Sequence, residues 1–373
     1  MLKGIHLTLM IGPAVPRAVS HEVVEALTSV EIQTGVGKPS TFQLQFQVGK
    51  RSRIDEAFML AGLSPIPFVR VVLVATVQGQ PTVLIDGVMT NHQFAPATKG
   101  LSTLTVTGED LTRMMSFQDR SGLPFPAMPA FARVALILAR YAPLGIIPMV
   151  IPNISMHVPL PNNRVPTQSG SDYEYITHLA SECGYEFYLE PQSLPGTSTA
   201  YWGPSIKHGQ PQPALTMDSD GHNNVEAINF SYESQERSLP ILMIQESTTK
   251  IPIPIPIGDI SPLNPPMGKV IPLPTRYSLG NAAKLSFAEA LEQGLAIASK
   301  SSNQISARGS LDVLRYGRIL QARKLVGVRG AGTAFDGTYY VKSVSYKLKR
   351  GEFKQDFELS RNALVSLSDR VAV

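Results

Sequence analysis

The feature that most constrains this chain is a strict alternation of apolar and polar residues in several short stretches. Residues 41–48 read Thr-Phe-Gln-Leu-Gln-Phe-Gln-Val, and residues 103–107 read Thr-Leu-Thr-Val-Thr. Successive side chains of a strand point to opposite faces, so each stretch has one apolar face and one face of amides and hydroxyls. Residues 5–11 also alternate, and residues 68–77 form a longer apolar run. These short strands, separated by turn signals, predict a β-barrel or sandwich over residues 1–115.

Residues 171–190 carry the clearest local signal. Ser171 and Glu174 have the spacing of a capping box, in which both side chains satisfy backbone N–H groups at the start of a helix. Apolar residues then recur at the spacing of one helix face, and Gly184 suits a left-handed cap at the C-terminal end. Tyr185, Phe187 and Leu189 alternate after it. The pattern predicts a helix over 172–183, a glycine, and then a strand.

Prolines and two further patterns organise the rest of the chain. Residues 130–142 have helical spacing, which Pro143 and Gly145 end. Residues 250–275 contain eight prolines, which exclude a helix or a central strand, so we expect an extended connector or a strap on another surface. A second capping box at 286–289 predicts a helix to about residue 300. Residues 340–348 and 353–359 flank Arg350-Gly351, which predicts a hairpin.

Composition limits the possible partners. The chain of 373 residues is 43% apolar but only 17% charged, which predicts two or three domains whose surfaces are largely covered by other proteins. The net charge of +4 is spread along the chain without a basic stripe, so direct binding to nucleic acid is not expected. No segment is long and apolar enough to predict a membrane span. Cys183 stands alone, so no internal disulfide is expected.

The residues that usually carry chemistry do not form a recognisable site. Seven histidines lie far apart, and His178 is expected to be a surface residue of its helix. The glycines around Lys38 lack the spacing of a phosphate loop. A polar group at 218–223 could bind a cation, but a polar turn explains it with fewer assumptions: Asp218, Asp220, His222 and Asn223. We therefore expect no catalytic residue, no cofactor and no metal, and a protein that is not an enzyme.

Several segments together resemble the phage late control D family, the tail hub proteins of contractile phages and related injection systems. The resemblance is carried by residues 171–190, by Ala200-Tyr-Trp-Gly-Pro204 with Asn224-Val-Glu226, by Gly309-Ser-Leu-Asp312 with residues 315–323, and by residues 337–344 and 351–359. The chain departs from the family pattern at Tyr346, near which a histidine is expected, and at Arg361-Asn362-Ala363, where Arg-Glu-Gly is expected. The hub part of valine-glycine-repeat spike proteins is similar as well.

The resemblance implies a mostly β, α+β fold with two β-barrel domains that each look like a tail-tube subunit, separated by α/β insertions. We expect a first barrel over 1–115, an α/β insertion over 116–200, strands of the second barrel over 201–250, a proline-rich strap and helix over 251–301, and the rest of the second barrel over 302–373. Three copies would offer six barrels, so a homotrimer could adapt a sixfold inner tube to a threefold spike.

The family also implies partners and a location. We expect contacts with an inner tube protein, with baseplate wedge components and with a spike that is a separate polypeptide, because the chain stops after the closing hairpin. Assembly is expected in the cytoplasm, as a virion component or part of a phage tail-like particle that can be released from the cell.

Within that architecture, the polar faces of the two alternating stretches are candidates for a channel wall that lets cargo pass without sticking. The candidate residues are Gln43, Gln45, Gln47, Thr103, Thr105 and Thr107. Alternation alone does not separate this role from that of an ordinary solvent-facing sheet. Two other functions remain open: a tail-associated cell-wall hydrolase, and a free β-rich adhesin that binds glycans.

Overall fold

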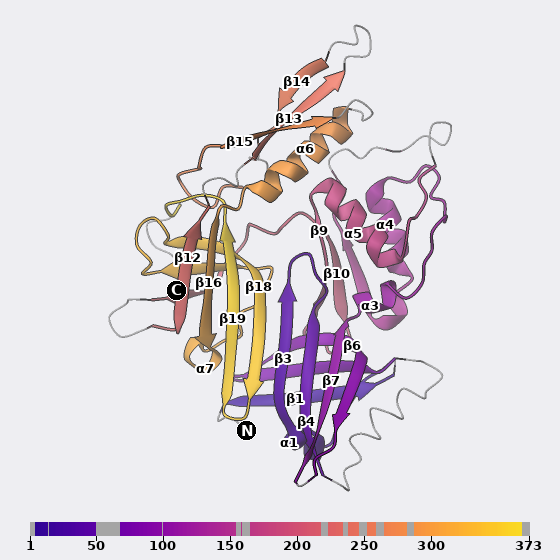
Figure 1. The fold of residues 1–373 in the computed structure, drawn as a ribbon, viewed down its shortest axis with the longest axis vertical. Helices are drawn as coiled ribbons and strands as arrows, with labels where there is room; N and C mark the ends of the chain where they lie inside the picture. Colours follow the sequence, from indigo (N-terminus) through magenta and orange to yellow (C-terminus); the bar gives the residue numbers. More distant parts are fainter. Residues whose placement is uncertain are drawn as a thin grey trace.

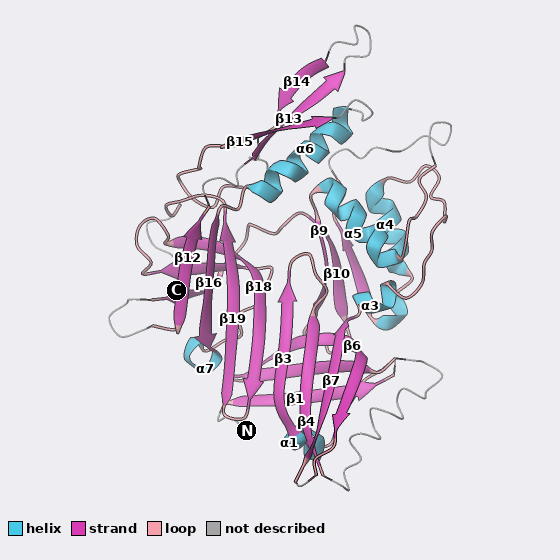
Figure 2. Cartoon of the chain, in the orientation of Figure 1, coloured by secondary structure: helices cyan, strands magenta, loops and turns pink. Residues whose placement is uncertain are grey.

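The computed structural model describes residues 4–13, 15–49, 68–98, 100–153, 158, 165–217, 223–233, 238–245, 252–258, 265–281 and 287–367. Strands dominate, and the helices gather in a side module and beneath a small upper sheet (Figure 1, Figure 2). The described helices outside these two places are short: α1 (His21–Ala26) and α7 (Val313–Tyr316). The chain is therefore mostly β, as the alternating sequence predicts.

One large sheet joins both ends of the chain. Its order is β12 (Ala227–Tyr232), β16 (Ile305–Asp312), β19 (Glu352–Arg361), β18 (Gly337–Lys349), β3 (Leu27–Gly35), β4 (Thr41–Val48), β7 (Ser102–Asp110), β6 (Gln80–Ala95), β5 (Arg70–Val77), β1 (Ile5–Gly12) and β2 (Arg17–Ala18). Two further strands attach through β18: β17 (Leu325–Arg329), which pairs with β18, and β11 (Gln212–Thr216), which pairs with β17.

The described strands form open sheets and no closed barrel, which corrects the expectation of two barrels. The reason is the pairing of β18 with β3, which joins the N-terminal and C-terminal strands into one sheet instead of closing each half on itself. Ser343 lies opposite Gly35 at one end of this joint, and Lys349 lies opposite Ser29 at the other.

The two halves of the sheet repeat one strand order. The N-terminal half runs β3-β4-β7-β6-β5, and the C-terminal half runs β12-β16-β19-β18-β17. In chain order, each strand of the first half corresponds to one strand of the second. A bulge falls at the same place in both halves, between Met89 and Asn91 on β6 and between Val341 and Ser343 on β18. The chain thus contains the same five-strand unit twice.

The apolar faces of the alternating strands form the main core. Phe42, Leu44 and Phe46 are buried, as predicted. Strand β1 crosses behind the near-vertical strands in Figure 1 and contributes Ile5 and Leu9 to the same core. The predicted closing hairpin is confirmed as β18 and β19, with Lys349 opposite Glu352. Buried residues of the N-terminal strands and of the C-terminal strands belong to one hydrophobic cluster. Their common burial stabilises the contact between the two halves of the sheet.

The side module places helices against a three-stranded sheet of order β8-β10-β9. It consists of α3 (Thr112–Met115), α4 (Ala130–Ala139), the 3₁₀ turn Ala142–Leu144, β8 (Ile146–Val150), α5 (Asp172–Cys183), β9 (Glu186–Pro191) and β10 (Ser198–Gly203). The capping box on α5 is confirmed, since Ser171 Oγ accepts from the Glu174 N–H at 3.3 Å and Glu174 accepts from the Ser171 N–H at 2.8 Å. Fully buried Trp202 lies beneath this helix.

Gly184 is required at the end of α5 for two reasons. Its φ of +68° is left-handed, and a Cβ there would lie 2.6 Å from the Cα of Ala296 on α6 (Phe287–Ser301). The helix predicted from the second capping box is thus confirmed as α6, and it packs against the end of α5. Ser286 of that capping box lies outside the described residues.

The proline-rich segment forms an edge strand. β14 (Pro252–Pro256) pairs with β13 (Ser238–Gln245), which also pairs with β15 (Arg276–Asn281). The Ile257 N–H donates to the Pro240 carbonyl at 2.9 Å, so by alternation the prolines at 252, 254 and 256 direct their missing N–H toward the outer edge. Helix and central strand are excluded here, as predicted. The segment 252–256 is an edge strand whose outer edge has no N–H groups to donate, because prolines occupy the outward-facing positions.

The two positions that depart from the family pattern have clear structural roles. Tyr346 is buried, and its hydroxyl donates to the Leu320 carbonyl at 3.3 Å. Asn362 accepts from the Met267 N–H at 2.8 Å and donates to the Pro265 carbonyl at 2.9 Å. These departures therefore fasten neighbouring loops to the sheet.

Candidate functional site: the polar face of the large sheet

The six candidate residues for a channel wall lie together on one face of two adjacent strands. β4 and β7 are antiparallel neighbours, and the three glutamines pair with the three threonines: Gln43 with Thr107, Gln45 with Thr105, and Gln47 with Thr103. Gln47 and Thr103 are exposed, and the other four are half-buried. The residues between them on both strands are buried, so the pleat separates a core-facing apolar side from a polar side.

The polar face continues onto both neighbouring strands. Asn91 and Gln93 of β6 lie opposite Thr107 and Thr105. On the other side Ser29 of β3 donates from its hydroxyl to Gln45 Oε1 at 3.0 Å. Sequence reasoning did not single out these residues, although Val30-Glu31-Ile32-Gln33 has the same alternation and could have indicated them.

The other half of the same face carries charges that are paired with one another. Lys347 Nζ lies 2.6 Å from Asp356 Oδ2, and Lys354 Nζ lies 3.0 Å from Glu226 and 3.1 Å from Glu352. The hydrogen bond to Asp356 raises the pKa of Lys347, and those to Glu226 and Glu352 raise the pKa of Lys354. Eight strands from β12 to β6 thus present one polar surface. Its N-terminal half is rich in amides and hydroxyls and also carries Glu31, opposite Gln43, and Glu109, opposite Thr41, whereas its C-terminal half carries the paired charges.

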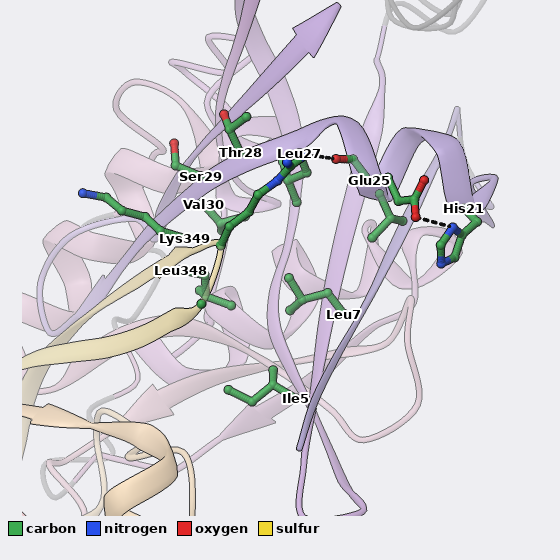
Figure 3. A pocket seen from close by; sticks show the side chains of 13 residues that line it. Ile5, Leu7, His21, Glu25, Leu27, Thr28, Ser29, Val30, Leu348 and Lys349 are labelled. Carbon is green, nitrogen blue, oxygen red and sulfur yellow. Dashed lines mark hydrogen bonds and ion pairs between the residues drawn. The ribbon is translucent and has the colours of Figure 1, made fainter. Parts of the chain in front are cut away.

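A hollow beside the large sheet is of a different kind. A cavity of about 480 Å³ lies between β1, α1, β3 and the β18–β19 turn, with aliphatic walls that include Ile5, Leu7 and Leu348 (Figure 3). Glu25 contacts two polar groups at its rim: His21 Nδ1 lies 3.3 Å from its side chain, and Arg350 donates to its carbonyl at 2.6 Å. The pair is about two-thirds exposed, so this hollow has no water-excluded pair of catalytic groups.

The residues considered for chemistry are dispersed where the structure describes them. His178 is exposed and lies 3.4 Å from Glu182, one turn along α5. Burial raises the pKa of the Cys183 thiol, which fits a small apolar residue and not a nucleophile. Over the described ranges, no group of three or more His, Cys, Asp or Glu side chains could hold a metal ion. Asp218, Asp220 and His222 lie outside the described residues.

Among the helices that the structure describes, none combines the length and the apolar character that crossing a bilayer requires. No protein-family model matches the chain. No curated protein matches it in sequence either.

Solved structures do match. A tail protein from Neisseria meningitidis MC58 has 14% identity and a TM-score of 0.64, over 96% of this chain and 97% of that one. The 43 kDa tail protein of prophage MuSo2 from Shewanella oneidensis has 13% identity and a TM-score of 0.60, over 96% and 98%. The c3393 protein of E. coli, a component of the type VI secretion system described as similar to the T4 tail proteins gp27 and gp5, has 11% identity and a TM-score of 0.52, over 93% and 75%.

The fold is therefore that of phage tail proteins. More particularly, it is shared by two bacterial tail proteins, one of them from a prophage, along nearly their whole length, and by a component of the type VI secretion system, so the resemblance indicated by the sequence is confirmed at the level of the fold.

Proposed function

We propose that this chain is the structural hub of a phage tail baseplate or contractile injection system, and that it works as a homotrimer between a sixfold inner tube and a threefold spike. The repeated strand order carries the proposal. A chain that contains one unit twice presents six similar units when three copies assemble, while the assembly as a whole keeps threefold symmetry. In this role the chain needs no catalytic residue.

The five-part domain division belongs to the same proposal. The tube-like units would be residues 1–115 and the strands of 201–250 and 302–373. The α/β insertion of 116–200 and the segment of 251–301 would face other parts of the baseplate. The strand repeat supports this division, because β3 to β7 lie in the first unit and β12 with β16 to β19 lie in the second.

In this assembly we propose that the polar face lines the channel, with Gln43, Gln45, Gln47, Thr103, Thr105 and Thr107 in the half that is rich in amides and hydroxyls. Amides and hydroxyls compete poorly with water for a passing protein, and the charges on the other half are already paired. Such a wall offers cargo few strong attachment points. The low charge content of the chain supports the large partner-covered surfaces that the hub role requires.

The copy number provides the direct test. We expect mass photometry of the purified protein to find particles of three times the 40.4 kDa chain mass, or, after addition of the spike protein, particles of that mass plus the mass of the spike. A chain that stays monomeric under both conditions would contradict the hub proposal.

The channel wall can be tested at Thr105, which lies between Gln45 and Gln93 among the amides and hydroxyls of the polar face. Thr105→Arg is expected to change the free energy of unfolding by less than about 1 kcal/mol, because the side chain lies half-buried on the polar face and outside the core. It should lower cargo delivery by assembled particles, since an unpaired charge now faces the cargo. Thr98→Arg, in an exposed loop off the sheet, is the matched control and should deliver normally. Equal delivery by both variants would assign the patch to an ordinary outer surface.

A further inference from the structure

Two strand edges of the large sheet have a neighbour on one side only. Among the described strands, residues 91–95 of β6 pair with β7 alone, and β12 pairs with β16 alone. Each edge carries an exposed aromatic side chain: Phe94 is 46% exposed and Tyr232 is 43% exposed. Unpaired N–H and C=O groups beside exposed aromatic rings are what a strand-pairing partner covers.

The internal repeat shows how such edges are covered. β6 corresponds to β18 and β12 corresponds to β3, and within the chain β18 pairs with β3. Counting from the matching bulges, Asn91 corresponds to Ser343, so Phe94 corresponds to Tyr346. Tyr346 is only 5% exposed, because it packs opposite Ile32 at the joint. Phe94 occupies the same place in its own unit without an equivalent neighbour.

We propose that β6 of one copy pairs with β12 of the next copy, in the register that β18 and β3 use within a chain. Carrying that register over, Phe94 lies opposite Phe230, His92 lies opposite Tyr232, and Gln93 lies opposite Ser231. The aromatic residues then share the core side, and Gln93 and Ser231 extend the polar face from one copy to the next. Pro96, which lacks an N–H, follows the last paired residue and ends the contact.

The proline edge on β14 supports this assignment by contrast. There the chain removes the outward donors from a free edge, at every second residue. Residues 91–95 and 227–232 contain no proline, so both of their edges keep a full set of backbone donors. The pairing joins two different edges, so two copies do not meet through the same edge in a symmetric, isologous contact. The contact is head to tail, and it closes into a ring or grows into a filament.

This inference rests on the proposed assembly into a ring, and it specifies how the ring is closed. The joint between copies repeats the joint within a copy, so each of the units around the ring meets its neighbours through equivalent strands. The threefold assembly would then approach sixfold symmetry along its whole polar face.

An engineered disulfide tests the register. At the internal joint the Val36 N–H donates to the Lys342 carbonyl at 3.0 Å, so by alternation Ser345 and Gln33 form a non-hydrogen-bonded pair, the kind with the closest Cα atoms. Gln93 and Ser231 are the corresponding pair between copies. In the full chain, Gln93→Cys with Ser231→Cys is expected to form a disulfide between copies under mild oxidation, at a separation of about 4.5 Å between Cα atoms.

Non-reducing gels should show a ladder that stops at three cross-linked chains. The matched control combines Gln93→Cys with Asn229→Cys, on the same face but two residues out of register and too far for a disulfide. Wild-type protein controls for Cys183. A ladder that runs past three would support the strand pairing and contradict the trimeric hub. Trimers by mass photometry without a cross-link, or equal cross-linking of the control pair, would overturn the pairing and leave the hub proposal standing. No cross-link at the highest soluble concentration would overturn it as well.

Discussion

Phe42→Asp is expected to abolish stable folding of the large sheet. Phe42 is 3% exposed on the core side of β4, opposite Ile32 of β3. Its ring fills the space above Gly108, where an added Cβ would lie 2.3 Å from the ring. Removing a buried aromatic ring costs about 3–5 kcal/mol, and placing a carboxylate in an apolar core adds several more. The sum is comparable to the whole stability of a typical protein, about 5–15 kcal/mol.

The measurement is urea unfolding followed by circular dichroism, together with the soluble yield. Gln43→Asp is a close control, because the neighbouring residue receives the same carboxylate on the polar face, and a change within about 1 kcal/mol is expected there. Phe42→Leu keeps most of the apolar volume and should cost about 1–2 kcal/mol. If Phe42→Asp unfolds at the same urea concentration as the wild type, the register of β4 is wrong.

Arg70→Met should be the second most damaging change, because it leaves a carboxylate buried without its main partner. The guanidinium of Arg70 holds Asp86 through two hydrogen bonds, from Nε to Oδ1 and from Nη2 to Oδ2, both 2.7 Å long. Nη2 also donates to the Gly196 carbonyl at 2.9 Å, which ties the large sheet to the side module. Both side chains of the pair are at most 4% exposed. Breaking such a pair on one side typically costs about 3–5 kcal/mol.

The double variant distinguishes an isolated buried charge from lost packing. Arg70→Met with Asp86→Leu removes both charges, so it should recover most of the stability that Arg70→Met loses. Thermal unfolding of the wild type, both single variants and the double variant completes the cycle. A double variant as unstable as the sum of the two single variants would show that the pair is not coupled as the geometry implies.

The sequence predicted the local elements well for a definable reason. The alternation at 41–48 and 103–107 identified two strands and their buried faces, and the six candidate wall residues do lie side by side. The capping box and Gly184 gave the start and end of α5. Each of these signals depends on residues within a few positions of one another, where pleat and helix geometry act directly.

Other features escaped the sequence. β8 contains Pro148, yet it pairs in parallel with β10 as an edge strand. The salt bridge between Arg70 and Asp86 was not predicted either, because an apolar run in the sequence does not indicate which residue of another strand will pair with a charge inside it. The polar face was predicted on two strands and extends over eight, because its other members become neighbours only through strand order.

By itself, then, the sequence determined which side of each alternating strand faces the core and where the main helices begin and end. It also determined that residues 252–256, with their prolines, do not lie in the interior of a sheet. The tertiary structure alone decided that β18 meets β3, about 310 positions away along the chain, and so produced one continuous sheet where two barrels were expected. The physical reason is that a strand's faces are set by its own alternation, whereas its neighbours are set by which edges meet when distant segments pack together.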